Sequence, residues 1–192
     1  MKKILIGTLN QGKFKEIAYL ISKKIRKISP LSLKINSPKE TGKTFISNSR
    51  LKVDYFSKFV KYPVISDDSG MCIKSLNNEP GIYSARLAKE CGSFHKAMKL
   101  ILKKLVKKKN RKATFFCSLS YKRPGSKIIS VQGKIDGEIA NKILGKKGFG
   151  YDPIFIPKNY KMTFAQMSKL KKIKIDHRFI AFKKLKKTIK TL

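Results

Sequence analysis

The chain has 192 residues, of which 41% are hydrophobic, so its length and composition suit one folded domain with a substantial core. This composition excludes an intrinsically disordered chain, and no apolar run approaches the ~20 residues of a transmembrane helix. The apolar stretch near the N-terminus is too short for a signal peptide and is interpreted as a buried first strand. We therefore expect a single domain over residues 1–192, located in the cytoplasm without membrane attachment.

The formal net charge of +35 favours phosphate-bearing partners and makes nucleic-acid binding without catalysis the first alternative. Only six of the 46 basic residues are arginine, the residue preferred for bidentate contacts with bases and phosphates. The lysines are also spread along the chain. We expect only nonspecific, salt-sensitive contact with nucleic acid. Three cysteines without zinc-ligand spacing, Cys72, Cys91 and Cys117, are interpreted as packing thiols.

In the first part of the chain, the hydrophobic pattern predicts strands that alternate with helices. A strand is expected over residues 3–8 and a helix over residues 13–25, with apolar residues on one face. Thr44 is a candidate N-cap for a second helix that runs to about Val60. Val64-Ile65-Ser66 is expected to form a short buried strand.

Farther along, the pattern predicts a helix and then a hairpin. Ser93 is a candidate N-cap for an amphipathic helix, and residues 113–122 and 127–136 are expected to pair through a turn at Pro124-Gly125. A glycine-rich loop precedes a strand expected at residues 153–156, and the last helix is expected over residues 177–190. The order of elements predicts an α/β fold with a mixed twisted sheet flanked by helices.

The first candidate site is a glycine-containing turn between the first strand and the first helix. Free backbone N–H groups and the positive end of a helix make such a turn a phosphate-binding site. Lys13 can reach a phosphate oxygen. The spacing matches a P-loop, but Phe14 replaces the hydroxyl residue that would bind Mg²⁺, so a metal would be held elsewhere. A tight turn with a surface lysine is the structural alternative. The turn reads Gly7-Thr8-Leu9-Asn10-Gln11-Gly12-Lys13.

The second candidate site contains two adjacent carboxylates, Asp67 and Asp68, directly after the short apolar strand. Open α/β sheets place their chemistry at strand ends, and Mg²⁺ prefers carboxylate oxygens. The chain has only 11 acidic residues against 46 basic ones, so two in succession are unusual, although a turn cap is an alternative. Glu40 adds a third carboxylate from a loop.

Two further segments carry aromatic or cationic groups suited to a nucleotide. Residues 145–153 place three glycines around Phe149 and Tyr151, which favours packing against a flat ligand, although a mobile hairpin loop is the alternative. Asp176-His177-Arg178 opens the last helix and follows Lys172, and the guanidinium suits bidentate contact with a carbonyl or a phosphate.

Taken together, these segments resemble the inosine triphosphate pyrophosphatase family. The order and spacing of its motifs hold over about residues 4–185. The family patterns are T-x-N-x-x-K, E-x-G-x-T-F-x-x-N-x-x-x-K, D-D-S-G followed by P-G-x-Y-S-A-R, G-F-G-Y-D-P-I-F, and S-H-R. They correspond here to Thr8–Lys13, Glu40–Lys52, Asp67–Gly70 with Pro80–Arg86, Gly148–Phe155, and Asp176–Arg178.

The resemblance implies a two-lobed α/β protein with a central active-site cleft, usually a homodimer, that uses Mg²⁺. The implied reaction converts a nucleoside triphosphate and water to the monophosphate and pyrophosphate, with ITP, dITP and XTP preferred. Such an enzyme would remove deaminated purine nucleotides from the cellular pool. A relative of the same fold that cleaves modified or pyrimidine triphosphates is the alternative enzyme.

The resemblance also implies a role for each candidate residue. Asp68 would be the general base and a metal ligand, with Glu40 on the metal side. The triphosphate would be held by the turn residues Thr8, Leu9, Asn10, Gln11, Gly12 and Lys13, with Ser69. The base pocket would be formed by Phe149, Gly150, Tyr151 and Asp152. Lys172, His177 and Arg178 would contact the phosphate and the base.

Two residues depart from the family pattern. The serine that precedes the His-Arg pair is Asp176 here, which places a carboxylate near the expected base pocket. The acidic pair that precedes the family lysine is replaced by Leu170 and Lys171, so Lys172 is assigned by its distance from His177. Both changes bear on substrate preference or turnover and leave the expected metal and triphosphate residues unchanged.

Overall fold

The structure is a computed structural model that describes residues 2–189. The strands are β1 (Lys3–Ile6), β2 (Arg26–Ile28), β3 (Val64–Ile73), β4 (Lys112–Lys122), β5 (Ile129–Ile139) and β6 (Phe155–Pro157). The α-helices are α1 (Gln11–Leu20), α2 (Phe45–Ser57), α3 (Ser84–Glu90), α4 (Phe94–Lys104), α5 (Lys169–Ile173) and α6 (His177–Thr188). Short 3₁₀ turns occupy Pro30–Leu33, Lys74–Leu76, Gly81–Tyr83, Asp152–Ile154 and Phe164–Gln166.

The strands form one six-stranded sheet in the order β2-β1-β3-β4-β5-β6. Strand β1 pairs in parallel with β2 and β3, whereas β5 and β6 are antiparallel, so the sheet is mixed. This confirms the predicted α/β class with helices flanking a mixed sheet. None of the helices within residues 2–189 has the length and apolar character needed to cross a membrane.

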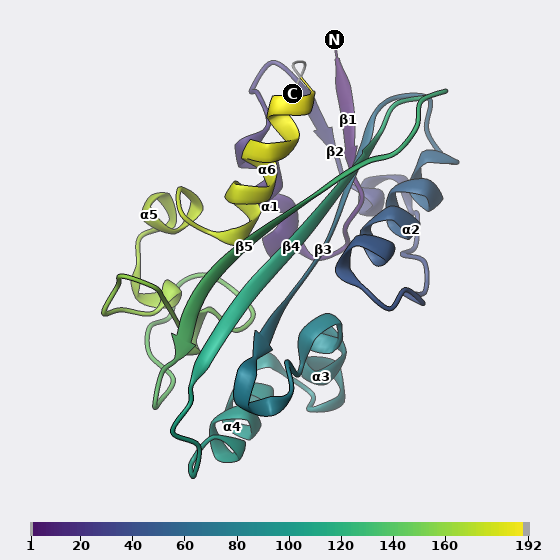
Figure 1. The fold of residues 1–192 in the computed structure, drawn as a ribbon. Helices are drawn as coiled ribbons and strands as arrows, with labels where there is room; N and C mark the ends of the chain where they lie inside the picture. Colours follow the sequence, from purple (N-terminus) through teal and green to yellow (C-terminus); the bar gives the residue numbers. More distant parts are fainter. Residues whose placement is uncertain (1, 190–192) are drawn as a thin grey trace. The chain divides into compact units, whose positions relative to one another are not determined.

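The described residues divide into two compact units. Unit 1 contains residues 2–68, 117–133 and 178–189, and unit 2 contains residues 69–116 and 134–177. The three long strands β3, β4 and β5 each contribute residues to both units (Figure 1). The two units therefore share strands, although each has apolar clusters of its own.

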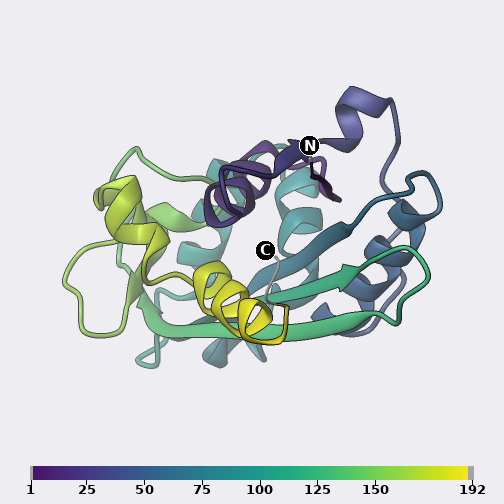
Figure 2. The same ribbon diagram turned by 90° about the horizontal axis from the view of Figure 1, so that it is seen from above.

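Unit 1 has helices on both faces of its part of the sheet because side chains alternate along its strands. Ile4 and Ile6 of β1 pack in a cluster with α1 and α6, and the intervening Leu5 packs in another cluster with α2. Helix α6, drawn in yellow, lies against the strands on its own side (Figure 2). Successive residues of a strand in unit 1 therefore pack alternately against α1 and α6 on one face and against α2 on the other.

Unit 2 packs α3 and α4 against its strands. Ala88 of α3 and Ala97, Met98 and Ile101 of α4 join a cluster with apolar residues of β3, β4, β5 and β6. The N-terminus of α4 is capped as predicted, since the Ser93 hydroxyl accepts a hydrogen bond from the Lys96 N–H at 3.1 Å. The other predicted cap is also confirmed, because Thr44 forms a reciprocal capping box at the start of α2.

Several predicted elements differ in their bounds from those observed. The helix predicted over residues 13–25 is α1, which ends at Leu20, and the short strand β2 follows it. Ile21 and Ile25 lie beyond the helix but are buried in the same apolar cluster as α1. Their burial makes the sequence pattern look helical over a segment that is not a helix. The strand predicted over 153–156 is shifted, because a 3₁₀ turn precedes β6. Helix α6 ends at Thr188, and residue 190 lies outside the described residues.

The largest difference concerns the strand that carries the two aspartates. It was predicted to end at Ser66, but β3 continues to Ile73, so Asp67 and Asp68 lie within a strand. Gly70 is required by close packing within this strand, because a Cβ there would lie 2.2 Å from the Gly81 carbonyl oxygen. The neighbouring strand β1 ends at Ile6, which pairs with Ile65. The two aspartates therefore lie just beyond the end of β1, although they are within β3.

Candidate active site

The two adjacent aspartates point to opposite faces of strand β3. Ile65 belongs to the cluster with α1 and α6, and Val64 belongs to the cluster with α2. Alternation along the strand therefore directs Asp67 toward α1 and α6 and Asp68 toward α2. Both are buried, with exposed fractions of 0% and 3%. The two carboxylates consequently belong to different polar networks.

The turn that precedes α1 is held by its own polar side chains. The Thr8 hydroxyl accepts a hydrogen bond from the Asn10 N–H at 3.2 Å, and Asn10 caps α1 by accepting from the Lys13 N–H at 3.0 Å. Gln11 and Gly12 form the first turn of the helix, and Leu9 is half-buried. The predicted strand–turn–helix is confirmed, and it places the Lys13 side chain near β3.

Asp67 is the counter-ion of two cations. Its Oδ2 lies 3.2 Å from the Lys13 Nζ and 3.8 Å from the Arg178 Nε. Arg178 also donates from Nη1 to Glu16 of α1. Burial raises the pKa of Asp67, but the nearby charges of Lys13, Arg178 and Lys52 outweigh burial and lower this pKa to about 2.

Asp68 lies in a second network, on the α2 side of the strand. Its Oδ2 accepts a hydrogen bond from the Asn48 Nδ2 at 3.1 Å, and its Oδ1 lies 3.6 Å from the Lys52 Nζ. The Lys52 ammonium also donates to the Glu40 Oε1 at 2.5 Å. Burial raises the pKa of Asp68, although the Lys52 and Lys13 charges oppose the shift. Asp68 is thus suited to accept a proton.

The loop that carries Glu40 is tied to the same helix. The Asn48 Oδ1 accepts a hydrogen bond from the Gly42 N–H at 2.8 Å, while its amide nitrogen donates to Asp68. A Cβ at Gly42 would lie 2.5 Å from the Asn48 Oδ1, so the close approach requires glycine. Asn48 therefore sets where the Glu40 loop lies relative to Asp68.

The carboxylates of Glu40 and Asp68 fit a magnesium ion in their chemistry. Both face one cation position, which the Lys52 ammonium takes in this structure. Among residues 2–189 no group of three or more His, Cys, Asp or Glu side chains could hold a metal. Mg²⁺ is commonly bound by one or two carboxylates, with water and substrate phosphates as the remaining ligands, so two are sufficient.

In unit 2, the glycine-rich loop is held by an ion pair. The Asp152 Oδ2 accepts hydrogen bonds from the Phe149 N–H at 2.9 Å and from the Lys172 Nζ at 2.6 Å. The Lys172 ammonium also lies 4.7 Å from the centre of the Phe149 ring. A Cβ at Gly148 would meet the Asp152 carboxylate at 2.1 Å. Lys172 is therefore adjacent to the glycine-rich loop.

The remaining aromatic residue of the loop points into unit 2. Tyr151 is 3% exposed, its hydroxyl donates to the Ser84 carbonyl oxygen at 2.8 Å, and its ring packs edge-on against Phe94. Burial raises the pKa of Tyr151, which keeps the phenol protonated as a donor. Gly150 is half-buried beside Phe94. Tyr151 thus anchors the loop to the motif residue Ser84.

The two neighbours at the start of α6 belong to different units. His177, in unit 2, is buried and stacks on Phe115 with ring centres 4.7 Å apart. Arg178, in unit 1, is paired with acidic side chains. Asp176 is fully buried, and Ser69 is the first residue of unit 2.

Three residues of these networks had received no role from the sequence. Asn48 and Lys52 belong to the family motif over Glu40–Lys52, and their spacing of four residues places them on one face of α2. Glu16 lies outside every motif. The sequence does offer one indication of its role: Glu16 is an acidic residue beside the apolar Ile17 in a chain with few acidic residues.

The fold and the site together define a class of protein. A strand–turn–helix at the end of β1 and cations held by buried carboxylates are features of α/β proteins that bind phosphate groups. Comparisons with known proteins identify the family within this class.

Residues 4–188 match the Ham1 family. The chain is 41% identical over 197 residues to a dITP/XTP pyrophosphatase of Oceanobacillus iheyensis, with 100% of both chains covered. It is 37% identical to a dITP/XTP pyrophosphatase of Bacillus subtilis, with 98% of each covered. The Ham1 protein of Staphylococcus aureus superposes with a TM-score of 0.87 at 37% identity over 98% of each chain. The chain belongs to the Ham1 family, which confirms the resemblance seen in the sequence.

The opposite orientations of the two aspartates predict opposite effects on stability. Asp67→Asn removes the buried counter-ion of Lys13 and Arg178 and should lower the free energy of unfolding by about 3–5 kcal/mol. Asp68→Asn removes a carboxylate whose raised pKa means that its charge costs stability at neutral pH. In chelator-containing buffer its free energy of unfolding should equal or exceed that of the wild type. Urea unfolding measures both, and equal losses in the two variants would contradict the assignment.

The lowered pKa of Asp67 also predicts how stability responds to acid. Because the folded-state pKa of about 2 lies below the ordinary value of 3.8, the stabilisation is complete above pH 3.8 and is lost as the pH falls through about 2. The difference in unfolding free energy between wild type and Asp67→Asn should therefore be constant from pH 7 to above pH 4 and shrink below it. A difference that is already declining at pH 6 would contradict this pKa.

Proposed function

We propose that this protein hydrolyses non-standard purine nucleoside triphosphates, namely ITP, dITP and XTP, to the monophosphate and pyrophosphate. Full-length relatives at 37–41% identity bear the name dITP/XTP pyrophosphatase, which supports this substrate class. The observation that carries the chemistry is Asp68, a buried carboxylate with a raised pKa that faces the same cation position as Glu40. The enzyme would remove deaminated purines from the nucleotide pool, and we place it in the cytoplasm for that reason.

The residues of unit 1 are assigned to the triphosphate and the metal. A triphosphate carries about four negative charges, so attack by water requires cations around the phosphorus. The turn from Thr8 to Lys13 would bind phosphate oxygens through its N–H groups and its ammonium, with Ser69 of unit 2 as a further donor. Glu40 and Asp68 would hold Mg²⁺, which when bound supplies charge neutralisation at the phosphates. Asp68 would accept the proton of the attacking water.

The assignments in unit 2, and that of Arg178, concern the base. Phe149 would stack on the purine, and Gly150, Tyr151 and Asp152 would shape the pocket around it. Lys172, His177 and Arg178 would contact phosphate and the purine carbonyl. The bases of ITP and XTP carry a carbonyl where adenine carries an amine, so pocket donors that hydrogen-bond to the carbonyl oxygen leave the adenine amine unpaired. Such a mismatch costs about 1–3 kcal/mol, which supports rejection of ATP.

The reaction is tested with purified protein, Mg²⁺ and a panel of ITP, dITP, XTP, GTP, ATP and pyrimidine triphosphates. We expect pyrophosphate and the monophosphate from the first three and slower turnover of the others. Release of orthophosphate, or equal rates with ATP, would contradict the proposal, and preference for a pyrimidine would favour the alternative enzyme. Steep salt-dependent binding of duplex or RNA without any hydrolysis would favour a nucleic-acid-binding protein.

The general-base assignment has a matched control on the same unit. Asp68→Asn should lower kcat by roughly 10²–10⁴-fold, because the attacking water loses its proton acceptor. Asp54→Asn replaces an exposed acid that pairs with Lys58 and Lys122, and it should leave kcat unchanged. Full activity of Asp68→Asn would refute the assignment.

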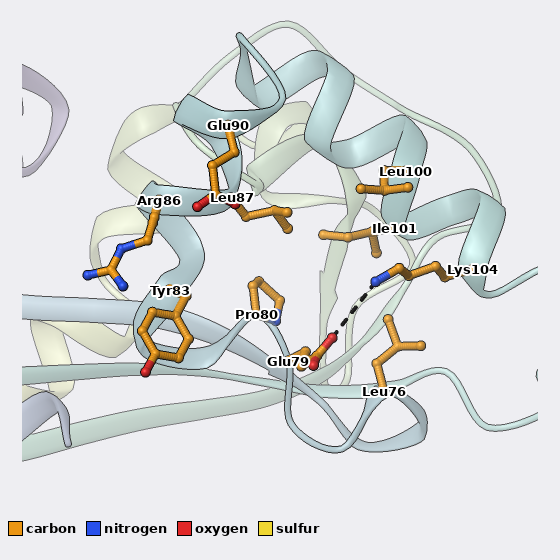
Figure 3. A pocket seen from close by; sticks show the side chains of 10 residues that line it. All are labelled: Leu76, Glu79, Pro80, Tyr83, Arg86, Leu87, Glu90, Leu100, Ile101 and Lys104. Carbon is orange, nitrogen blue, oxygen red and sulfur yellow. Dashed lines mark ion pairs between the residues drawn. The ribbon is translucent and has the colours of Figure 1, made fainter. Parts of the chain in front are cut away.

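We also propose that the protein acts as one functional domain and forms a homodimer. The single domain is supported by the three long strands that contribute to both units. A dimer of a chain with net charge +35 needs a surface that is not itself strongly basic. A face of unit 2 fits this need: a cavity of about 350 Å³ with an apolar floor and a rim that carries both charge signs (Figure 3).

The rim of this cavity is balanced and offers aromatic contacts. Its charged residues are Glu79, Glu90, Arg86 and Lys104, and the first pairs with the last at 3.8 Å. Tyr83 is 53% exposed, and the Arg86 guanidinium lies 4.8 Å from the centre of its ring. Tyrosine and arginine are enriched at protein interfaces, and a rim with both signs can pair with its own copy about a two-fold axis.

The dimer surface is tested by multi-angle light scattering at several concentrations. Tyr83→Lys should shift the protein toward monomer mass, because it places a further charge against the partner. Tyr19→Lys is the matched control, since Tyr19 has the same exposed fraction of 53% but lies on α1 of unit 1. A wild-type monomer at every concentration would contradict the dimer, and dissociation by both substitutions would contradict the choice of surface.

A further inference from the structure

The cation position between Glu40 and Asp68 is taken by a side chain of the protein itself. The Lys52 Nζ lies 2.5 Å from the Glu40 Oε1 and 3.6 Å from the Asp68 Oδ1. The Lys52 side chain is 6% exposed and that of Asp68 is 5% exposed, whereas that of Glu40 is 31% exposed. The ammonium is therefore sequestered, and the position is reached from solvent on the Glu40 side.

Asn48 holds the Asp68 carboxylate and the backbone of the loop that carries Glu40 independently of Lys52. Asn48 donates to Asp68 and accepts from the Gly42 N–H in the loop that carries Glu40. Helix α2 presents Asn48 and Lys52 four residues apart, and the Thr44 capping box fixes the start of this helix. Two carboxylates held toward one point repel each other unless a cation lies between them. In this structure the Lys52 ammonium supplies that cation.

We propose that Lys52 is an internal competitor of the divalent cation: metal binding displaces its ammonium from the two carboxylates, and an anion supplied by the substrate favours this displacement. A divalent ion bound to the two carboxylates at about 2.0–2.1 Å would lie against the ammonium, and like charges at that separation repel strongly. The displaced ammonium remains in a buried setting and needs a new counter-ion. A substrate phosphate provides one, which couples metal binding to triphosphate binding.

This coupling rests on the proposed function for its substrate but makes a separate prediction for the protein alone. Without a nucleotide, the wild type should bind divalent cations weakly, because the Lys52 ammonium must give up its ion pairs with Glu40 and Asp68. Removal of the ammonium should leave two carboxylates without their cation and strengthen metal binding. Lys52 is on this account a positioning residue that sets the order of ligand binding, in addition to any contact that it makes with phosphate.

The test measures Mn²⁺ binding to the nucleotide-free protein by electron paramagnetic resonance of the free ion. Lys52→Met should lower the Kd for Mn²⁺ by about tenfold or more relative to the wild type, because a like charge beside the ion is removed. Lys58→Met is the matched control: it removes an exposed lysine at the end of α2, and it should leave the Kd unchanged. An unchanged or higher Kd in Lys52→Met would overturn the proposal.

A second measurement uses the wild type and does not depend on the folding of a variant. Lysines are labelled briefly with acetic anhydride, with and without saturating Mg²⁺, and quantified by mass spectrometry. Acetylation of Lys52 should be slow without the metal and rise when Mg²⁺ displaces the ammonium, whereas acetylation of Lys58 should not change. Mg²⁺ binding without any change at Lys52 would overturn the proposal. Failure of every triphosphate to react would refute the proposed function and leave both of these readouts interpretable.

Discussion

The arrangement of the site depends on ion pairs between buried cations and a small number of carboxylates. The chain has 11 acidic residues and 46 basic ones, yet four cations, Lys13, Lys52, Lys172 and Arg178, each have a carboxylate partner. Burial of such cations without a partner would cost several kcal/mol each, so the pairs make preformed cationic groups compatible with the folding of each unit. The pairs are Lys13–Asp67, Arg178–Glu16, Lys52 with Glu40 and Asp68, and Lys172–Asp152.

Because side chains alternate along strand β3, its two aspartates lie on opposite faces and have different roles. Asp67 faces α1 and α6, where two cations lower its pKa and make it a structural anion. Asp68 faces α2, where burial raises its pKa and leaves a carboxylate whose charge costs stability but which can accept a proton. One step along a strand thus separates the residue that holds the site together from the residue suited to chemistry.

Much of this could be predicted from the sequence because its causes are local. Thr44 and Ser93 cap helices through bonds three residues away, and the turn before α1 closes on its own side chains. The full length of β3 could not be predicted, because the apolar run that indicates the strand ends before Asp67, and the need for glycine at position 70 arises from its contact with Gly81. Glu16 escaped notice for the same reason: its partner is 162 residues away. Lys52 was visible in a motif, but its position between two carboxylates is a tertiary property.

The central claim is that these carboxylates hold the site cations until a substrate replaces them. A crystal structure with Mn²⁺ and a non-hydrolysable ITP analogue tests this directly, since the anomalous signal locates the metal. The account predicts a metal peak bound by Glu40 and Asp68, with the Lys52 and Lys13 ammonium groups moved onto phosphate oxygens. A metal bound elsewhere, with Lys52 still between the two carboxylates, would contradict it.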